Sequence, residues 1–204
     1  MGKEDQDGVS RRGFLKGLST TLAATAVGAG AEAAEAAGQA GTAQTLSGMV
    51  PVSLTVNGKP TTARVDIRRT LLEMLRTDLD LTGAKQVCDR GTCGACTVIL
   101  NGKTVYSCMT LAVDAEGAKV ETIEALEKNG KLHPVQEAFV KHDALQCGFC
   151  TPGMVMSCKA LLDKNPKPSL DQIKESCSGN LCRCGTYPHI FSAVLEASGQ
   201  GGKK

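Results

Sequence analysis

The pattern of hydrophobic and polar residues is that of strands in the first half of the chain. Apolar and polar residues alternate over Val52–Val56 and return over Thr61–Val65, on either side of Asn57-Gly58. Alternation with a period of two is typical of a strand, and Asn-Gly is typical of the tight turn between antiparallel strands. A second such arrangement surrounds Asn101-Gly102, and a further short strand is predicted over 119–123. The pattern therefore predicts two hairpins in a small mixed sheet.

A short helix is predicted between the two hairpins. Thr70 is a residue type that caps helix N-termini, and apolar residues follow it at helical spacing. These apolar residues are Leu71, Leu72, Met74 and Leu75. Residues 83–96 show neither period, so they are predicted to form an irregular loop.

The period becomes helical from about residue 125. Ser169 and Gln172 form a capping box, and Thr151 is predicted as an N-cap with Pro152 at the first helical position. The four predicted helices begin near His133-Pro134, Thr151, Ser169 and Tyr187-Pro188, and the last ends near Gly199. Four short helices with few aromatic residues predict a compact bundle.

The N-terminus carries an export motif. Residues 10–16, Ser-Arg-Arg-Gly-Phe-Leu-Lys, have the twin-arginine pattern of the Tat pathway, and a mildly apolar run follows over 17–31. That run has about fifteen residues, whereas a membrane-spanning helix needs about twenty. We therefore expect a Tat signal and linker over 1–47, a periplasmic location and no stable membrane span. The alternative is an Ala/Gly-rich tail with a chance pair of arginines.

The ten cysteines are the most informative feature of the composition. The net charge is only +2, and no basic stripe with interleaved aromatic residues is present, so nucleic-acid binding is not indicated. Ten cysteines indicate disulfides, zinc sites or iron–sulfur clusters. Because Tat substrates cross the membrane already folded, often around a cofactor, a Tat signal favours metal-bound thiolates over disulfides.

The first cysteine group has the spacing of a plant-type [2Fe–2S] site. The run Cys88-x4-Cys93-x2-Cys96 is followed by Cys108. Gly91 and Gly94 let the loop turn so that its N–H groups point at sulfur. Zinc sites usually combine two close cysteine pairs, and here the fourth cysteine stands alone, so the spacing favours iron.

The second cysteine group combines a Cys-x2-Cys with a Cys-x-Cys. Cys147, Cys150, Cys182 and Cys184 supply four thiolates, the number that holds a metal ion or an iron–sulfur cluster. The two remaining cysteines, Cys158 and Cys177, fall at helical positions without ligand-like neighbours. They are predicted to be small buried residues.

Three motifs together resemble the iron–sulfur subunit of the molybdenum hydroxylases, the family of xanthine dehydrogenases and aldehyde oxidoreductases. They span 88–97, 146–153 and 178–185, and the resemblance covers about 50–197. It implies an α+β chain, with a β-grasp ferredoxin domain over 48–124 and a four-helix domain over 125–198, each holding one [2Fe–2S] cluster. Residues 199–204 would be a tail. Gly185-Thr186-Tyr187 departs from the Thr-Gly-Tyr that is frequent in the family.

The resemblance also implies a function and partners. Electrons would pass from molybdenum–molybdopterin on a large subunit through both clusters to an FAD-binding medium subunit or a cytochrome. The substrate oxidised would be an aldehyde or an N-heterocycle, and the catalytic centre would lie on the partner chain. By motif position, Gln146 and Cys184 would contact the pterin. A Tat signal on the small subunit is similar to what exported bacterial aldehyde oxidoreductases show.

Two other functions remain open from the sequence. One is a free-standing periplasmic carrier with two clusters and no molybdenum partner. The other is an exported binding protein stabilised by zinc or disulfides.

Overall fold

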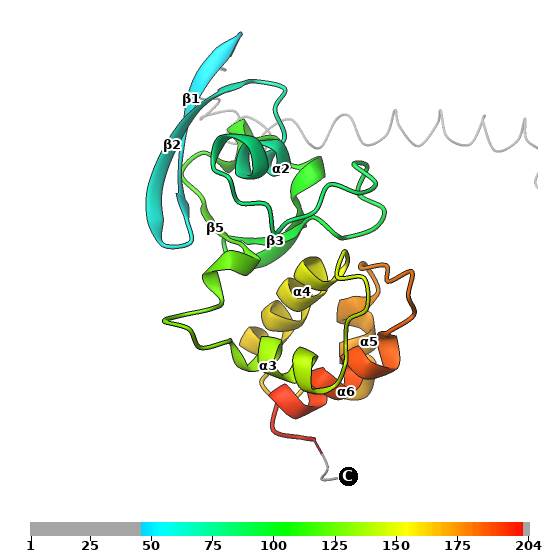
Figure 1. Ribbon diagram of the computed structural model, residues 1–204. Coiled ribbons are helices and arrows are strands. Elements are labelled where there is room, and N and C mark those ends of the chain that lie inside the picture. Colours follow the sequence, from blue (N-terminus) through cyan, green and yellow to red (C-terminus); the bar gives the residue numbers. More distant parts are fainter. Residues whose placement is uncertain (1–45, 202–204) are drawn as a thin grey trace, which may run out of the picture. The chain divides into compact units, whose positions relative to one another are not determined.

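The computed structural model describes residues 46–201 (Figure 1). The predicted export signal and most of its linker, at 1–45, lie outside these residues, as do the last residues of the predicted tail, at 202–204. No helix within 46–201 has the length and apolar character needed to cross a membrane.

Both predicted hairpins are confirmed. Strand β1 (Met49–Val56) pairs antiparallel with β2 (Lys59–Asp66), and β3 (Thr97–Leu100) pairs antiparallel with β4 (Lys103–Tyr106). Both residues of each Asn-Gly turn have positive φ, 52° and 78° in the first and 48° and 77° in the second. This conformation is the one that Asn and Gly adopt at low cost, and it matches the twist of the strands.

Strand β5 (Lys119–Glu121) completes a five-stranded mixed sheet with the order β2-β1-β5-β3-β4. It runs parallel to β1 and antiparallel to β3. The strand ends two residues before the predicted Ile123. Thr122 instead bonds the Asn57 side chain, with its N–H 2.9 Å from Asn57 Oδ1, and the 3₁₀ turn η4 (Ile123–Ala125) follows.

The predicted short helix packs against the sheet. Helix α2 (Leu71–Glu73) continues into the π-helical turn η1 (Met74–Asp78), and Thr70 and Glu73 form a reciprocal capping box. The four predicted apolar residues are fully buried and join the sheet residues Val52 and Val98 in one core. Two 3₁₀ turns, η2 (Ser107–Met109) and η3 (Val113–Ala115), lie between β4 and β5.

All four helices of the second half are present. They are α3 (Pro134–Lys141), α4 (Thr151–Lys164), α5 (Leu170–Cys177) and α6 (Tyr187–Ala197). Helix α3 packs against α6, and α4 packs against α5 (Figure 1). Phe139 is fully buried in their common core with Ile173 and Ile190. Together with the sheet, these helices confirm the predicted α+β class.

The predicted N-cap of α4 was wrong by one residue. Cys150 is the N-cap, and its carbonyl already accepts the N–H of Met154 at 3.0 Å. Thr151 is therefore the first helical residue, and its buried Oγ1 has no hydrogen-bond partner. The helix thus begins directly at a cysteine of the second group.

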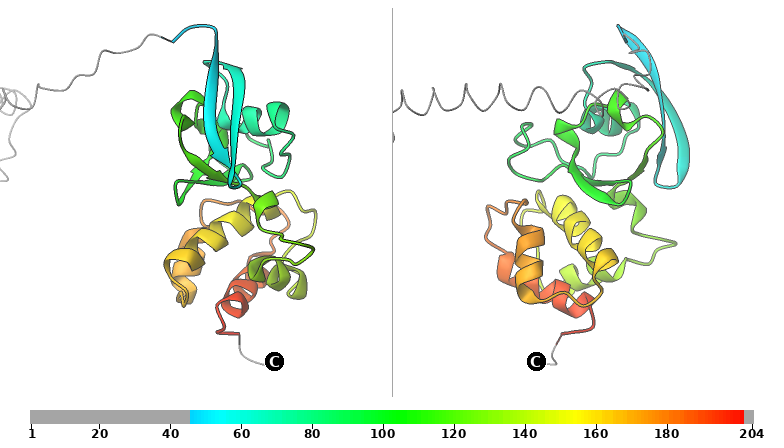
Figure 2. Two further views of the ribbon diagram at one scale, coloured as in Figure 1. Left: turned by 90° about the vertical axis from the view of Figure 1, so that its left-hand side faces the viewer. Right: turned by 180° about the vertical axis from the view of Figure 1, so that it is seen from behind.

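Two hydrophobic cores follow one another along the chain. Val120 belongs to the core of the sheet, whereas Ile123 already packs against the core of the helices. Helix α4 also packs against β3 (Figure 2). Ile99 of β3 belongs to the core of the helices. The sheet and the helices therefore share a contact surface. The predicted domain limits at 48–124 and 125–198 stay predictions.

Candidate metal centres

The first cysteine group comes together around one loop. Cys88, Cys93 and Cys96 lie in the irregular segment before β3, and Cys108 lies in η2, just after β4. The sulfurs of Cys96 and Cys108 are buried and lie 3.4 Å apart. Cys88 and Cys93 are both half-buried. The four thiols thus form an inner pair and an outer pair.

Backbone N–H groups of the loop point at these sulfurs. The N–H of Gly91 lies 3.4 Å from Cys108 Sγ, and the N–H of Thr92 lies 3.3 Å from Cys88 Sγ. Gly91 has φ 69°, and a Cβ there would come within 2.9 Å of Met109. The positive φ favours a glycine at this position of the loop.

The pKa values of Cys88 and Cys96 are shifted in opposite directions. The N–H of Arg90, together with the Cys93 thiol and the N–H of Thr92, lowers the pKa of Cys88 to about 6 against the effect of burial. Burial raises the pKa of Cys96 to about 11. The inner pair, Cys96 and Cys108, is thus less exposed to solvent than the outer pair.

The second cysteine group has the same arrangement. Cys147 and Cys150 precede α4, and Cys182 and Cys184 precede α6. The N–H of Phe149 and the thiol of Cys184 lower the pKa of Cys147, whereas burial and the thiol of Cys182 raise the pKa of Cys150. Cys182 is buried and Cys150 half-buried, whereas Cys147 is exposed. The pair Cys147/Cys184 is therefore the outer one.

Thr186 acts directly on the inner pair. Its hydroxyl lies 3.2 Å from Cys182 Sγ. Burial opposes ionisation of Cys182, but the Thr186 hydroxyl and N–H lower the pKa of this thiol to about 7. Burial raises the pKa of Cys150 to about 12. The Gly185-Thr186-Tyr187 order therefore places a hydroxyl beside a predicted ligand.

The donor set fits a binuclear iron–sulfur cluster. All ten cysteines lie in the described part of the chain, and all are free thiols. Between residues 46 and 201, no three His, Cys, Asp or Glu side chains gather around a single point. Burial divides the four thiols of each group into an inner and an outer pair. A [2Fe–2S] cluster takes two cysteines on each of its two irons. Thiols in two pairs, with N–H groups aimed at them, can hold such a cluster, and the ligand assignment itself stays a prediction.

The predicted pterin contacts lie at the outer side of the second group. Gln146 is exposed next to the exposed Cys147, and Cys184 is half-buried. Large apolar side chains of the same two loops are also exposed, with Phe149 at 58% and Leu181 at 55%. This edge of the molecule is therefore open to a partner.

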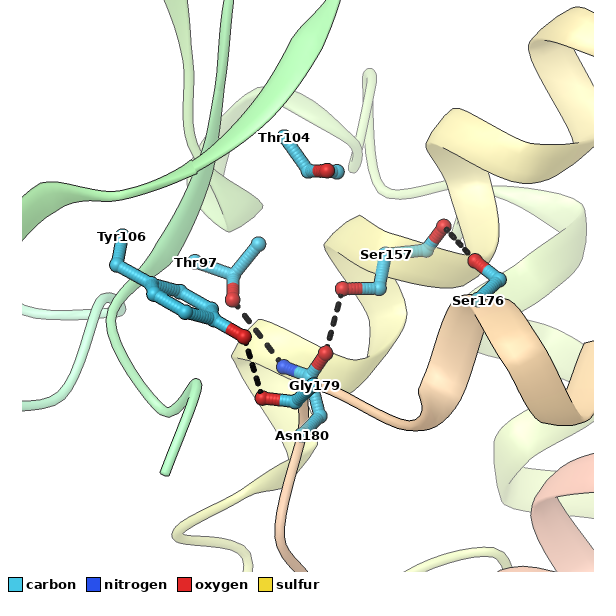
Figure 3. Close-up of a pocket in the computed structure, with 7 residues that line it drawn as sticks. All are labelled: Thr97, Thr104, Tyr106, Ser157, Ser176, Gly179 and Asn180. Carbon is cyan, nitrogen blue, oxygen red and sulfur yellow. Dashed lines mark hydrogen bonds between the residues drawn. The ribbon is translucent and has the colours of Figure 1, made fainter. Parts of the chain in front are cut away.

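A buried polar network that the sequence did not predict joins the two groups. The Asn180 side chain is 2% exposed and donates to Gly94 O at 2.9 Å and to Thr97 Oγ1 at 3.1 Å. Its Oδ1 accepts from Ser157 Oγ at 2.7 Å, and Tyr106 donates to Gly179 O at 2.8 Å (Figure 3). Asn180 lies within a motif that carries two cysteines, but the neighbouring residues do not indicate which groups its side chain hydrogen-bonds.

Backbone contacts bring the two groups closer still. The N–H of Leu181 donates to Cys93 O at 2.8 Å, so a neighbour of Cys182 bonds a residue of the first group. A Cβ on Gly153 would lie 2.3 Å from Gly94 O, which leaves room only for glycine. Gly153 stands in the first turn of α4, where glycine is unfavourable, and this was the sequence signal that the backbone of Gly94 lies close.

Two sequence families match the chain. The family described as "2Fe-2S iron-sulfur cluster binding domain" matches residues 54–133. The family described as "[2Fe-2S] binding domain" matches residues 122–195. Each match contains one of the two cysteine groups.

Individual proteins and solved structures are similar over most of the chain. The small subunit of nicotine 6-hydroxylase from Paenarthrobacter nicotinovorans is 49% identical, over 78% of this chain and 95% of the relative. The iron–sulfur-binding subunit of an Escherichia coli aldehyde oxidoreductase is 44% identical, over 74% of this chain and 73% of the relative. A chain of quinoline 2-oxidoreductase from Pseudomonas putida 86 aligns with a TM-score of 0.71 and 45% identity, over 76% of this chain and 99% of its own.

Removing the Asn180 side chain tests the network. Asn180→Ala leaves Gly94 O and Ser157 Oγ buried without this partner, so we expect the free energy of unfolding to fall by about 2–3 kcal/mol. Denaturant unfolding followed by circular dichroism measures the change. The control Tyr106→Phe removes one part-buried hydrogen bond and should cost about 1 kcal/mol. An Asn180→Ala variant that loses no more stability than the control would contradict a central role for this residue.

Proposed function

The chain belongs to the family of iron–sulfur subunits of molybdenum hydroxylases, and we propose that it conducts electrons from a molybdopterin-bearing large subunit to a separate acceptor. Its relatives are iron–sulfur subunits of oxidoreductases, so electron transfer is its role and the catalytic centre lies on the partner chain. We propose that the chain holds two [2Fe–2S] clusters in series and acts in the periplasm.

The observation that carries the proposal is the direct backbone link between two four-thiol groups. The N–H of Leu181 donates to the carbonyl of Cys93, and Leu181 is bonded in sequence to Cys182. A [2Fe–2S] cluster held by each group would supply a site that takes up and releases single electrons. The peptide groups on either side of this hydrogen bond provide a short connection between the groups. Asn180, hydrogen-bonded to Gly94, holds that connection in register.

The outer side of the second group suits contact with the molybdenum subunit. The Gln146 amide both donates and accepts hydrogen bonds, as the heteroatoms of a pterin require. Cys147 and Cys184 form the more exposed pair there, so a cofactor on a partner could approach a ligand sulfur closely. Phe149 and Leu181 add exposed apolar surface of the kind found in the centres of protein interfaces.

The outer side of the first group suits contact with the acceptor. Cys88 and Cys93 form its more exposed pair, and the neighbouring Val87 and Met109 are 54% and 65% exposed. The acceptor we propose is an FAD-binding medium subunit or a cytochrome. The relatives' names include a nicotine hydroxylase and aldehyde oxidoreductases, and they support an N-heterocycle or an aldehyde as the partner's substrate.

A free-standing carrier is the second candidate. It would use the same two cysteine groups. However, a carrier without a partner would not explain why Gln146 is exposed beside the exposed apolar side chains of Phe149 and Leu181. The open outer edge of the second group therefore favours a permanent partner.

Cysteine variants test the presence of two clusters. The purified chain should contain about four irons, because each of two [2Fe–2S] clusters holds two. Cys96→Ala and Cys150→Ala should each lose about half of the iron and one of two electron paramagnetic resonance signals of the reduced protein. The control Cys158→Ala lies outside both groups and should keep the full iron content and both signals. A variant that keeps its iron would remove that cysteine from the ligand set.

Purification from the native host tests the partner. We expect a C-terminally tagged chain to elute with a larger polypeptide and about one molybdenum per chain, and Gln146→Ala to slow cluster reduction by the partner's substrate. The readout is stopped-flow bleaching of visible absorption. Iron without molybdenum or a larger polypeptide would favour the free carrier. Zinc in place of iron would rule out both.

Export tests the proposed periplasmic location, which rests on the motif at 10–16. Replacing Arg11 and Arg12 by Lys keeps the charge but alters the twin-arginine pair, so the protein should accumulate in the cytoplasm with its clusters intact. Cell fractionation measures the distribution, and a variant with Lys16→Arg serves as a control that should still be exported. Equal periplasmic amounts of the double variant and the wild type would refute Tat export.

A further inference from the structure

Two cysteines outside both groups lie in contact inside the helical core. Cys158 is in the middle of α4, and Cys177 is the last residue of α5. Their sulfurs are 3.7 Å apart, and their exposed fractions are 0% and 1%. The proposed electron transfer uses neither thiol.

The two sulfurs are in direct contact and need to move little to form a bond. A disulfide bond is about 2.05 Å long, so the sulfurs would have to approach by less than about 2 Å. Ser176 Oγ already bonds Ser157 O at 3.3 Å, which shows that the backbones of α4 and α5 are close at this point. We propose that Cys158 and Cys177 are a redox-active pair that closes to a disulfide between α4 and α5.

The oxidant we assign is a disulfide, either of a thiol oxidoreductase or of a small molecule such as oxidised glutathione. The thiolate of Cys177 attacks one sulfur of the oxidant, forming a mixed disulfide and releasing one thiol. The thiolate of Cys158 then displaces the second thiol and forms the internal bond. Two protein thiols lose two electrons and two protons, and one oxidant disulfide becomes two thiols.

The position of Cys177 explains how an oxidant reaches a buried pair. Helix α5 has only eight residues, and Cys177 is at its C-terminal end. Helix ends open locally at low free-energy cost, whereas Cys158 is held in the middle of a fourteen-residue helix. The thiol of Cys158 also hydrogen-bonds Cys177 and lowers the pKa of Cys177, so Cys177 is the better initial nucleophile.

The disulfide would stabilise the segments that carry the second cysteine group. Cys177 accepts the N–H of Asn180 at its carbonyl, and Cys182 follows two residues later. Cys150 is the N-cap of helix α4. A bond from α4 to the end of α5 would therefore tie these two segments together. The oxidising compartment proposed above would supply the disulfides, but the thiol chemistry does not depend on electron transfer or on a partner.

Thiol counting on the holoprotein tests the proposal. The protein is incubated with oxidised glutathione or with dithiothreitol and then denatured in excess N-ethylmaleimide, which traps thiols and released sulfide. We expect two fewer labelled cysteines after oxidation, and a non-reduced digest in which the peptides of Cys158 and Cys177 are linked. Visible absorption of the oxidised holoprotein should be unchanged before denaturation, because no ligand thiol takes part.

The double variant Cys158→Ala/Cys177→Ala is the matched control. Oxidation should raise the Tm of the wild type by about 5–10 °C and leave that of the double variant unchanged. Ten labelled cysteines in the oxidised wild type, or the loss of two labels in the double variant as well, would overturn the proposal. Iron content is measured in parallel, so a chain without clusters is distinguished from a chain without the disulfide.

Discussion

The close approach of backbone at Gly94 and Gly153 sets the geometry on which both cysteine groups depend. Gly94 lies between two cysteines of the first group, and Gly153 lies in the first turn of the helix that begins at Cys150. A side chain at Gly153 would collide with the carbonyl of Gly94. Because no side chain separates them, the ligand loops of the sheet and of the helices can share hydrogen bonds. The Asn180 amide and the Leu181 N–H make those bonds.

Burial orders the thiols in the same way in both groups. Each group has an inner pair, in drier surroundings, and an outer pair nearer to solvent. The backbone link between the groups runs from Cys93 to the residue before Cys182, so it connects the outer pair of one group to the inner pair of the other. The outer pair of the second group is left facing outwards beside Gln146. An arrangement of this kind suits a chain that receives electrons at one surface and delivers them at another.

The remaining pair, Cys158 and Cys177, shows why burial alone does not describe a cysteine. Both residues are buried, as their helical positions predict, and each alone would be a small apolar filler. Only the crossing of α4 and α5 brings their sulfurs to 3.7 Å. That contact gives the pair a chemistry that neither position suggests by itself.

The sequence by itself determined the local structure and the groups of cysteines. The Asn-Gly turns, the capping box at Ser169 and the alternation in β1 are local effects, so they could be read from neighbouring residues and were confirmed. The N-cap of α4 was misplaced because the conformation of Cys150 is set by the fold of its loop and not by capping propensity. The tertiary structure alone decided which thiols pair within a group, which pair is buried, and that Asn180 bridges to Gly94. These contacts join residues up to 86 positions apart, and no local preference encodes a partner at that distance.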